Sequence, residues 1–255
     1  MSDGNQGGSG ATQPSPLAAA FFDVDGTIVS THIVHQYLFV RRHLAERNGR
    51  LLAGARHAVW QSAFYLRCLQ YLYLDHVSRT RMNVAFYRNY AGLRSDHVRQ
   101  AAVDCFDRLL KPHLYNEAIE QIVEHLRADR RVVLVTGSID FLIEPLARFL
   151  TDHAGSPARV DLLARTLLER DGRFTGELDG PPVGEQVKAQ EVRRYATDQG
   201  IDLSRSHAYG DSIADLPMLQ LVGYPCVVNG DRLLSREARR HGWPLAEWRL
   251  AGSAT

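Results

Sequence analysis

The 255-residue chain is poor in cysteine and contains no long apolar stretch. The apolar run at residues 17–22 is far shorter than the roughly 20 residues that cross a bilayer, so we expect no membrane partner. The three cysteines, Cys68, Cys105 and Cys226, are odd in number and lack the spacing of a metal site. This cysteine usage predicts a protein of the reducing cytoplasm.

The chain also lacks an excess of charge of either sign, with 30 basic and 29 acidic side chains. Binding to a phosphate backbone needs a basic excess or a basic run, so nucleic acid is not expected as a partner. Lysine is scarce. Only two of the 30 basic residues are lysines, Lys111 and Lys188, and the others are arginines. Residues 1–16, rich in glycine, serine, proline and glutamine, are expected to form a disordered N-terminal tail without the basic segment of a signal peptide.

Short apolar runs alternate with helical patterns along most of the chain. Runs that are apolar on both faces are typical of buried strands in a parallel sheet. Strands are expected at 17–22, 132–138, 159–166, 207–212 and, as an edge strand, 224–230. Helices are expected at 117–128, 141–150, 185–197 and 235–241, and a hairpin at 166–180. This order predicts an α/β fold with a doubly wound, mostly parallel sheet.

Residues 32–110 separate the first two predicted strands and show helical periodicity instead. They contain 11 of the 22 aromatic residues. Breaks near 48–49, 75 and 92–93 would divide the segment into about four helices. We therefore expect an all-helical cap at 32–110, inserted into a catalytic core formed by 17–31 and 111–250.

Two carboxylates, Asp23 and Asp25, follow the first predicted strand. Ligands of open α/β sheets bind at the carboxyl ends of the strands, so both are expected in the site. If the chain turns between them, one can attack while the other transfers protons. Repulsion between them would call for a nearby cation. The alternative is that Asp25 and the glycine after it only make a turn, with Asp23 capping a helix.

Further polar residues follow the other predicted strands. Thr136 stands beside a glycine whose N–H can approach an anion closely, although Ser138 can also be read as a helix N-cap. Asp211 and Asp215 are spaced to share one face of a helix turn, and Lys188 lies in the predicted helix at 185–197. Hydroxyl, lysine and carboxylates at one sheet edge predict a site for phosphate and Mg²⁺.

In this order, FDVDGT, VTGS, Lys188 and GDSIADLPML resemble the four motifs of the haloacid dehalogenase (HAD) superfamily. The helical insertion after the first motif resembles the cap of its phosphoserine-phosphatase-like branch. Segments such as FLIEPLAR and GPPVGEQVKAQ resemble the subfamily IB hydrolases. The resemblance covers about residues 17–248 and implies a HAD-like Rossmannoid core.

The resemblance also implies roles for the matched residues. Asp23 would be the nucleophile that forms an aspartyl-phosphate, and Asp25 the general acid and base. The phosphoryl oxygens would be bound by Thr136, Gly137 and Lys188. The implied activity is phosphomonoester hydrolysis on a small phosphorylated metabolite.

Mg²⁺ is the cofactor that the resemblance implies. Its ligands would be Asp23, the carbonyl of Asp25, and Asp211, while Asp215 would support the metal shell or Lys188. Two alternatives remain open: a phosphotransferase that uses the same intermediate, and a catalytically silent HAD-fold binding protein. The retention of Asp23, Asp25, Asp211 and Lys188 together argues against the second alternative.

One position in the predicted cap gives an indication of the substrate's identity. Phosphoserine enzymes place a glutamate nine residues after the nucleophile, where this chain has His32. An imidazole is a poor partner for an ammonium group, so phosphoserine is not expected to be the best substrate. The alternative is that His32 merely begins a helix in contact with solvent.

Overall fold

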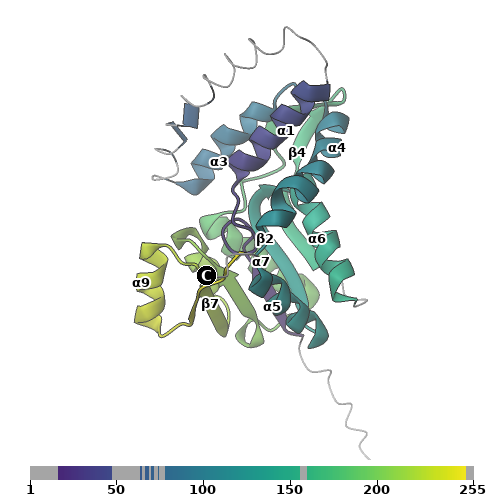
Figure 1. Ribbon diagram of the computed structural model, residues 1–255. Coiled ribbons are helices and arrows are strands. Elements are labelled where there is room, and N and C mark those ends of the chain that lie inside the picture. Colours follow the sequence, from purple (N-terminus) through teal and green to yellow (C-terminus); the bar gives the residue numbers. More distant parts are fainter. Residues whose placement is uncertain are drawn as a thin grey trace, which may run out of the picture.

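The computed structural model describes residues 17–47, 64, 67–68, 70–71, 74, 78–155 and 160–250. The predicted tail at 1–16 and the predicted helix breaks near 48–49 and 75 lie outside these residues. An α/β core carries a layer of helices at one end (Figure 1). This arrangement confirms the predicted fold class, an α/β core with a helical insertion.

The core is built on a six-stranded parallel sheet with the strand order β3-β2-β1-β6-β7-β8. Its central strand β1 has four fully buried residues, because it is covered on both faces. The strands are β1 (Ala19–Phe22), β2 (Arg131–Ile139), β3 (Val160–Arg165), β6 (His207–Gly210), β7 (Tyr224–Val228) and β8 (Leu245–Ala246). The three strands that precede the predicted motifs, β1, β2 and β6, are therefore neighbours.

The expectation that 224–230 forms an edge strand is wrong. Strand β8 pairs with β7 through Val227↔Leu245 and Val228↔Ala246, so β8 lies at that edge. The Asn229 N–H also donates to the Ala246 carbonyl at 2.9 Å. A strand of two residues has no apolar run of its own, and its formation depends on a neighbour that the sequence pattern does not reveal.

Helices cover both faces of the sheet. Alternate residues of β1 enter two cores: Phe22 packs in one with Ile122 and Leu146, and Phe21 packs in the other with Val192. The helices of the core are α5 (Asn116–Arg127), α6 (Asp140–Ala154), α7 (Glu185–Gln199), α8 (Leu216–Leu219) and α9 (Arg232–His241). The sheet is therefore doubly wound, as predicted. Among the described residues, no helix has the length and apolarity to cross a membrane.

The helical layer contains α1 (Ile33–Arg47), α3 (Arg79–Tyr87) and α4 (Ser95–Cys105). Its interior is aromatic: the ring of Tyr37 lies 5.5 Å from that of Phe86 and 4.9 Å from that of Tyr90. Such edge-on pairs add to the stability that the buried area provides. The predicted break near 92–93 separates Tyr90 from α4. Beyond α4 the chain returns to the core through a π-helical turn at Phe106–Leu110, which helical periodicity does not predict.

The predicted hairpin is confirmed as β4 (Leu167–Arg170) and β5 (Arg173–Leu178). Its turn residues Asp171 and Gly172 both have positive φ, as a two-residue hairpin turn requires. The hairpin hydrogen-bonds to the helical layer, because the Gly92 N–H donates to the Phe174 carbonyl and the Phe174 N–H to the Leu93 carbonyl. It thus contacts the predicted cap, although its sequence lies in the range assigned to the core.

Candidate active site

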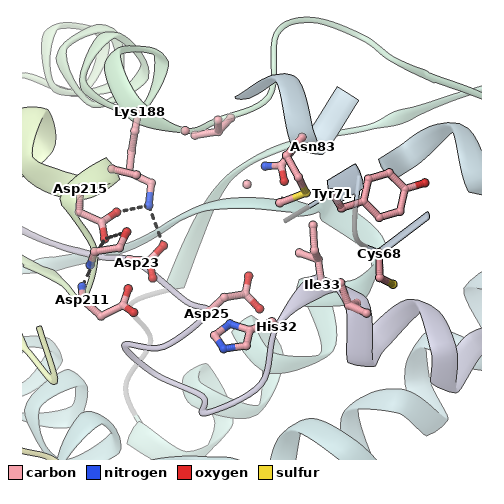
Figure 2. Close-up of a pocket in the computed structure, with 17 residues that line it drawn as sticks. Asp23, Asp25, His32, Ile33, Cys68, Tyr71, Asn83, Lys188, Asp211 and Asp215 are labelled. Carbon is pink, nitrogen blue, oxygen red and sulfur yellow. Dashed lines mark hydrogen bonds and ion pairs between the residues drawn. The ribbon is translucent and has the colours of Figure 1, made fainter. Parts of the chain in front are cut away.

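A cavity of about 390 Å³ lies between the core sheet and the helical layer. The carboxyl ends of β1, β2 and β6 and the first turns of α7 reach it from the core, and residues of α1 and α3 reach it from the other side (Figure 2). From the core, it is lined by Asp23, Asp25, Gly137, Lys188, Asp211 and Asp215. The predicted motifs therefore meet at one place, as the rule for parallel sheets requires.

Lys188 joins two carboxylates at the core end of the cavity. Its Nζ donates to Asp23 Oδ1 at 2.6 Å and to Asp215 Oδ1 at 2.5 Å, and all three side chains are buried (Figure 2). Burial alone would lower the pKa of Lys188, but the attraction of Asp215 and Asp23 raises it above its ordinary value. The lysine is therefore held as a cation. The second oxygen of Asp215 accepts from the backbone N–H groups of Asp211 and Ser212, which fixes its position.

Asp23 keeps one oxygen available. Its Oδ2 is buried and has no hydrogen-bond partner among the described residues. Burial raises the pKa of Asp23 to about 7; Lys188 opposes this rise and Asp215 adds to it. An oxygen of this kind can attack an electrophile or bind a cation, since an unpartnered buried carboxylate oxygen is otherwise costly.

The carboxylates of Asp23, Asp211 and Asp215 form a group whose oxygen atoms lie within 4.8 Å of one another. Close approach is possible because Gly26 has no side chain: a Cβ there would lie 2.2 Å from Asp211 Oδ2. Gly26 also has a φ of +100°, which favours glycine. Three hard oxygen donors at this spacing, one from each carboxylate, fit a divalent cation such as Mg²⁺.

Asp25 lies in a different environment from Asp23. Its Oδ1 accepts from Gln36 Nε2 at 3.0 Å, and its Oδ2 accepts from the hydroxyls of Ser138 at 2.7 Å and Thr136 at 3.4 Å. The side chain is thus oriented by neutral donors, whereas Asp23 is paired with a cation. Two carboxylates in unlike environments can perform different steps of one reaction.

The residues 136–138 lie at the end of β2. The Thr136 hydroxyl is buried and accepts from the Ser138 N–H at 3.0 Å. The reading of Ser138 as a helix cap is wrong, because α6 is preceded by Ile139 and the Ser138 hydroxyl is directed to Asp25. Gly137 borders the cavity, and a Cβ on it would lie 2.7 Å from Asn83 Nδ2. Glycine therefore lets helix α3 approach this end of β2.

Three residues near the site were not predicted from the sequence. Gln36 orients Asp25, Asn83 borders the cavity, and the Tyr87 hydroxyl donates to the Gly137 carbonyl at 2.7 Å. A signal was present for the two amides. Gln36 lies on the same apolar helix face as Tyr37, and Asn83 lies on the same face as Tyr87. A polar residue on an apolar face needs a hydrogen-bond partner.

His32 also borders the cavity, and it is the residue immediately before α1. Its side chain is exposed, and its ring packs on that of His35 with 6.1 Å between centroids. It therefore lies beside the cavity and is also in contact with solvent.

The family model for haloacid dehalogenase-like hydrolases matches residues 20–220, including every motif at the cavity. The chain belongs to this family. The predicted enzyme class, a HAD-type hydrolase, is thereby confirmed. A probable phosphatase of Mycobacterium tuberculosis is 34% identical over 243 residues, which are 92% of this chain and 77% of that protein.

Two further proteins extend the comparison. A phosphoserine phosphatase of Mycobacterium tuberculosis is 32% identical over 251 residues, covering 97% of this HAD hydrolase and 76% of the relative. The solved structure of a substrate-bound phosphoserine phosphatase has a TM-score of 0.60 at 17% identity, covering 91% of this chain and 93% of that one. At this identity the structural likeness shows a shared fold.

Proposed function

We propose that this HAD hydrolase is a Mg²⁺-dependent phosphomonoesterase that acts on a small phosphorylated metabolite through a phosphorylated Asp23. The observation that carries the proposal is the pair of unlike carboxylates, Asp23 beside Lys188 and Asp25 among neutral donors. The phosphatase relatives support it. We further propose that the enzyme acts in the cytoplasm, in keeping with its three unpaired cysteines.

The reaction has two steps. In the first, Asp23 Oδ2 attacks the phosphorus atom, the bond to the ester oxygen breaks, and Asp25 gives its proton to the departing alcohol. In the second, Asp25 takes a proton from water, the water oxygen attacks phosphorus, and the Asp23 carboxylate leaves. Inorganic phosphate is released and both carboxylates return to their starting states.

Lys188, the Thr136 hydroxyl and the backbone N–H of Gly137 would hold the phosphoryl oxygens. Lys188 is already a fixed cation at the nucleophile, at 2.6 Å from Asp23 Oδ1. The Thr136 hydroxyl donates to Asp25 Oδ2 at 3.4 Å, which is long for a hydrogen bond. This bond is therefore readily exchanged for one to phosphate. These donors would neutralise charge that spreads over the phosphoryl oxygens during transfer.

The carboxylates of Asp23 and Asp211 and the carbonyl of Asp25 would hold Mg²⁺. When bound, this ion supplies positive charge that reduces the repulsion between a phosphate dianion and the carboxylates. The grouping of Asp23 and Asp211, which each offer a carboxylate oxygen within 4.8 Å of the other, supports this assignment. Asp215 would act by positioning Lys188.

We also propose that residues 32–110 form the cap that selects the substrate, and that L-phosphoserine is not the preferred one. His32 borders the cavity where a carboxylate would be needed to pair with the substrate ammonium. Because His32 is exposed, the missing pair with the ammonium should cost about 1 kcal/mol.

The proposal is tested by hydrolysis of an aryl phosphate with Mg²⁺ and with excess EDTA. We expect turnover that needs Mg²⁺ and that EDTA abolishes. Asp211→Asn should need a higher Mg²⁺ concentration for half-maximal rate, whereas the control Asp198→Asn, on the exposed face of α7, should behave as wild type. Undiminished turnover in excess EDTA would contradict the metal assignment.

A further inference from the structure

The two ends of the cavity carry different side chains. At the core end are five charged residues, all from the predicted motifs. Among the described residues, the helical layer contributes no lysine, arginine, aspartate or glutamate to the lining. Its polar groups there are His32, Asn83 and the Tyr71 hydroxyl, which already accepts from Asn89 Nδ2 at 2.7 Å. The remaining wall is largely apolar and is formed by Ile33, Val34, Cys68, the ring of Tyr71, Met82 and, from the core, Val183.

Asn83 is the polar group within this apolar wall. It lies on α3, is 2% exposed, and its Oδ1 is buried without a hydrogen-bond partner among the described residues. Figure 2 shows the amide directed toward the space between Lys188 and Ile33. A buried acceptor without a donor costs free energy that a ligand can recover by donating to it.

The position of Asn83 relative to the reacting groups is fixed. The Tyr87 hydroxyl, one helical turn further along α3, donates to the Gly137 carbonyl at 2.7 Å. The close contact between Asn83 and Gly137 described above places the amide beside the loop that would bind phosphate. A leaving group attached to that phosphate would therefore pass the Asn83 side chain.

We propose that the substrate has an uncharged, largely apolar leaving group with one hydrogen-bond donor, and that Asn83 Oδ1 accepts from this donor. The inference rests on the proposed phosphomonoesterase activity and specifies its substrate class. An ammonium or carboxylate on the leaving group would lose its hydration against the apolar wall and gain no counter-charge from the described residues that the helical layer contributes to the lining. The cavity of about 390 Å³ has room for a group the size of a substituted ring.

Three matched probes test the proposal: phenyl phosphates that carry a methyl, a hydroxymethyl or an aminomethyl group at the same ring position. The three substituents have similar size. The methyl group is apolar, the hydroxymethyl group is a neutral hydrogen-bond donor, and the aminomethyl group is a cation. For the wild type with Mg²⁺, we expect kcat/KM for the hydroxymethyl compound to exceed that for the methyl compound by about tenfold. The aminomethyl compound should fall below the methyl compound by about tenfold or more.

Two variants assign the discrimination to Asn83. In Asn83→Leu, kcat/KM for the hydroxymethyl compound should fall to that for the methyl compound, whose own kcat/KM should change little. In Asn83→Asp, the aminomethyl compound should become the best of the three, because the new carboxylate pairs with its ammonium. The control Arg81→Leu changes an exposed residue of the same helix and should leave the wild-type order intact.

Failure of the inference is distinguishable from failure of the proposed activity. Equal kcat/KM for the three compounds, or a wild-type preference for the aminomethyl compound, would overturn the inference and leave the phosphomonoesterase intact. Turnover of none of them would overturn the activity. Calorimetric titration of the three compounds into Asp23→Asn with Mg²⁺ then decides the inference separately, because binding should follow the same order without turnover.

Discussion

The two ends of the cavity differ in how their polar groups are paired. At the core end, hydrogen bonds link Lys188 to Asp23 and Asp215, and Asp25 accepts from three side chains. At the other end, Asn83 stands in an apolar wall with its amide oxygen unpartnered.

This difference indicates that one end of the cavity performs the reaction and the other end selects the substrate. Groups that take part in bond breaking need fixed positions, because small displacements of reacting atoms cost large factors in rate. A selecting surface needs instead an interaction that one substrate satisfies and another does not. Changes at the core end should therefore lower the rate for every phosphomonoester, and changes at the other end should alter their ranking.

The largest effect is expected for Asp23→Asn. An amide attacks phosphorus poorly, so kcat should fall by roughly 10⁴-fold or more for all substrates. The fold should persist, because an asparagine still accepts a hydrogen bond from Lys188. Steady-state rates and circular dichroism measure the two effects. Near-normal turnover in this variant would place the nucleophile elsewhere.

Asp25→Asn should lower kcat by about 10²–10⁴-fold, the usual contribution of proton transfer. The loss should be greater for alkyl than for nitrophenyl phosphates, because an acidic leaving group needs less protonation. Rates over a series of leaving groups test this dependence. An equal loss across the series would exclude Asp25 as the acid in the first step.

The residues at the core end could be predicted because a strand end is visible in the sequence. Asp23 and Thr136 follow apolar runs, and parallel strands bring such positions to one edge. The partners Gln36 and Asn83 could not be placed, because the orientation of a helix face depends on packing against the rest of the protein. The two-residue strand β8 cannot be predicted either, because it forms only by pairing with β7, and 224–230 is therefore an inner strand and not the expected edge.

A smaller effect is expected for Gln36→Leu. Its Nε2 donates to Asp25 Oδ1 at 3.0 Å, so the variant should leave Asp25 less well oriented and lower kcat by about tenfold. As a positioning residue, Gln36 should shift the pH profile of kcat while KM changes little. Gln190→Leu, an exposed change on α7, is the control. An unchanged profile in Gln36→Leu would show that the two hydroxyls alone orient Asp25.

His32→Glu should change the ranking of substrates rather than the rate of chemistry. The new carboxylate can pair with an ammonium at the edge of the cavity, so kcat/KM for L-phosphoserine should rise about fivefold relative to an uncharged phosphomonoester. Because His32 is exposed, water weakens this pair. If L-phosphoserine is already the best substrate of the wild type, the role given to His32 is wrong.

No effect on activity is expected for His125→Gln, on the far side of β1 from α7. Burial, His207 and Arg130 lower the pKa of His125 from 6.5 to about 3, so the folded protein holds it neutral. Its contribution to the free energy of unfolding is present above pH 6.5 and is lost as pH falls toward 3, by about 1.4 kcal/mol per pH unit at most.

Urea unfolding at several pH values measures this dependence, with the exposed His153→Gln as control. The wild type and the control should lose stability with the same slope as pH falls, and His125→Gln should show a shallower slope. Equal slopes in all three would mean that His125 binds a proton as readily in the folded protein as in the unfolded one, which contradicts the lowered pKa.

The phosphorylated nucleophile is the central claim, and acid quenching during turnover tests it directly. Mass spectrometry of the quenched protein and its peptides should locate one added phosphoryl group on Asp23. With a nitrophenyl phosphate, whose leaving group needs little protonation in the first step, the group should accumulate in Asp25→Asn, where water is activated poorly, and be absent from Asp23→Asn. A phosphoryl group on Ser138 or Thr136, or none on any residue while phosphate is released, would contradict the account.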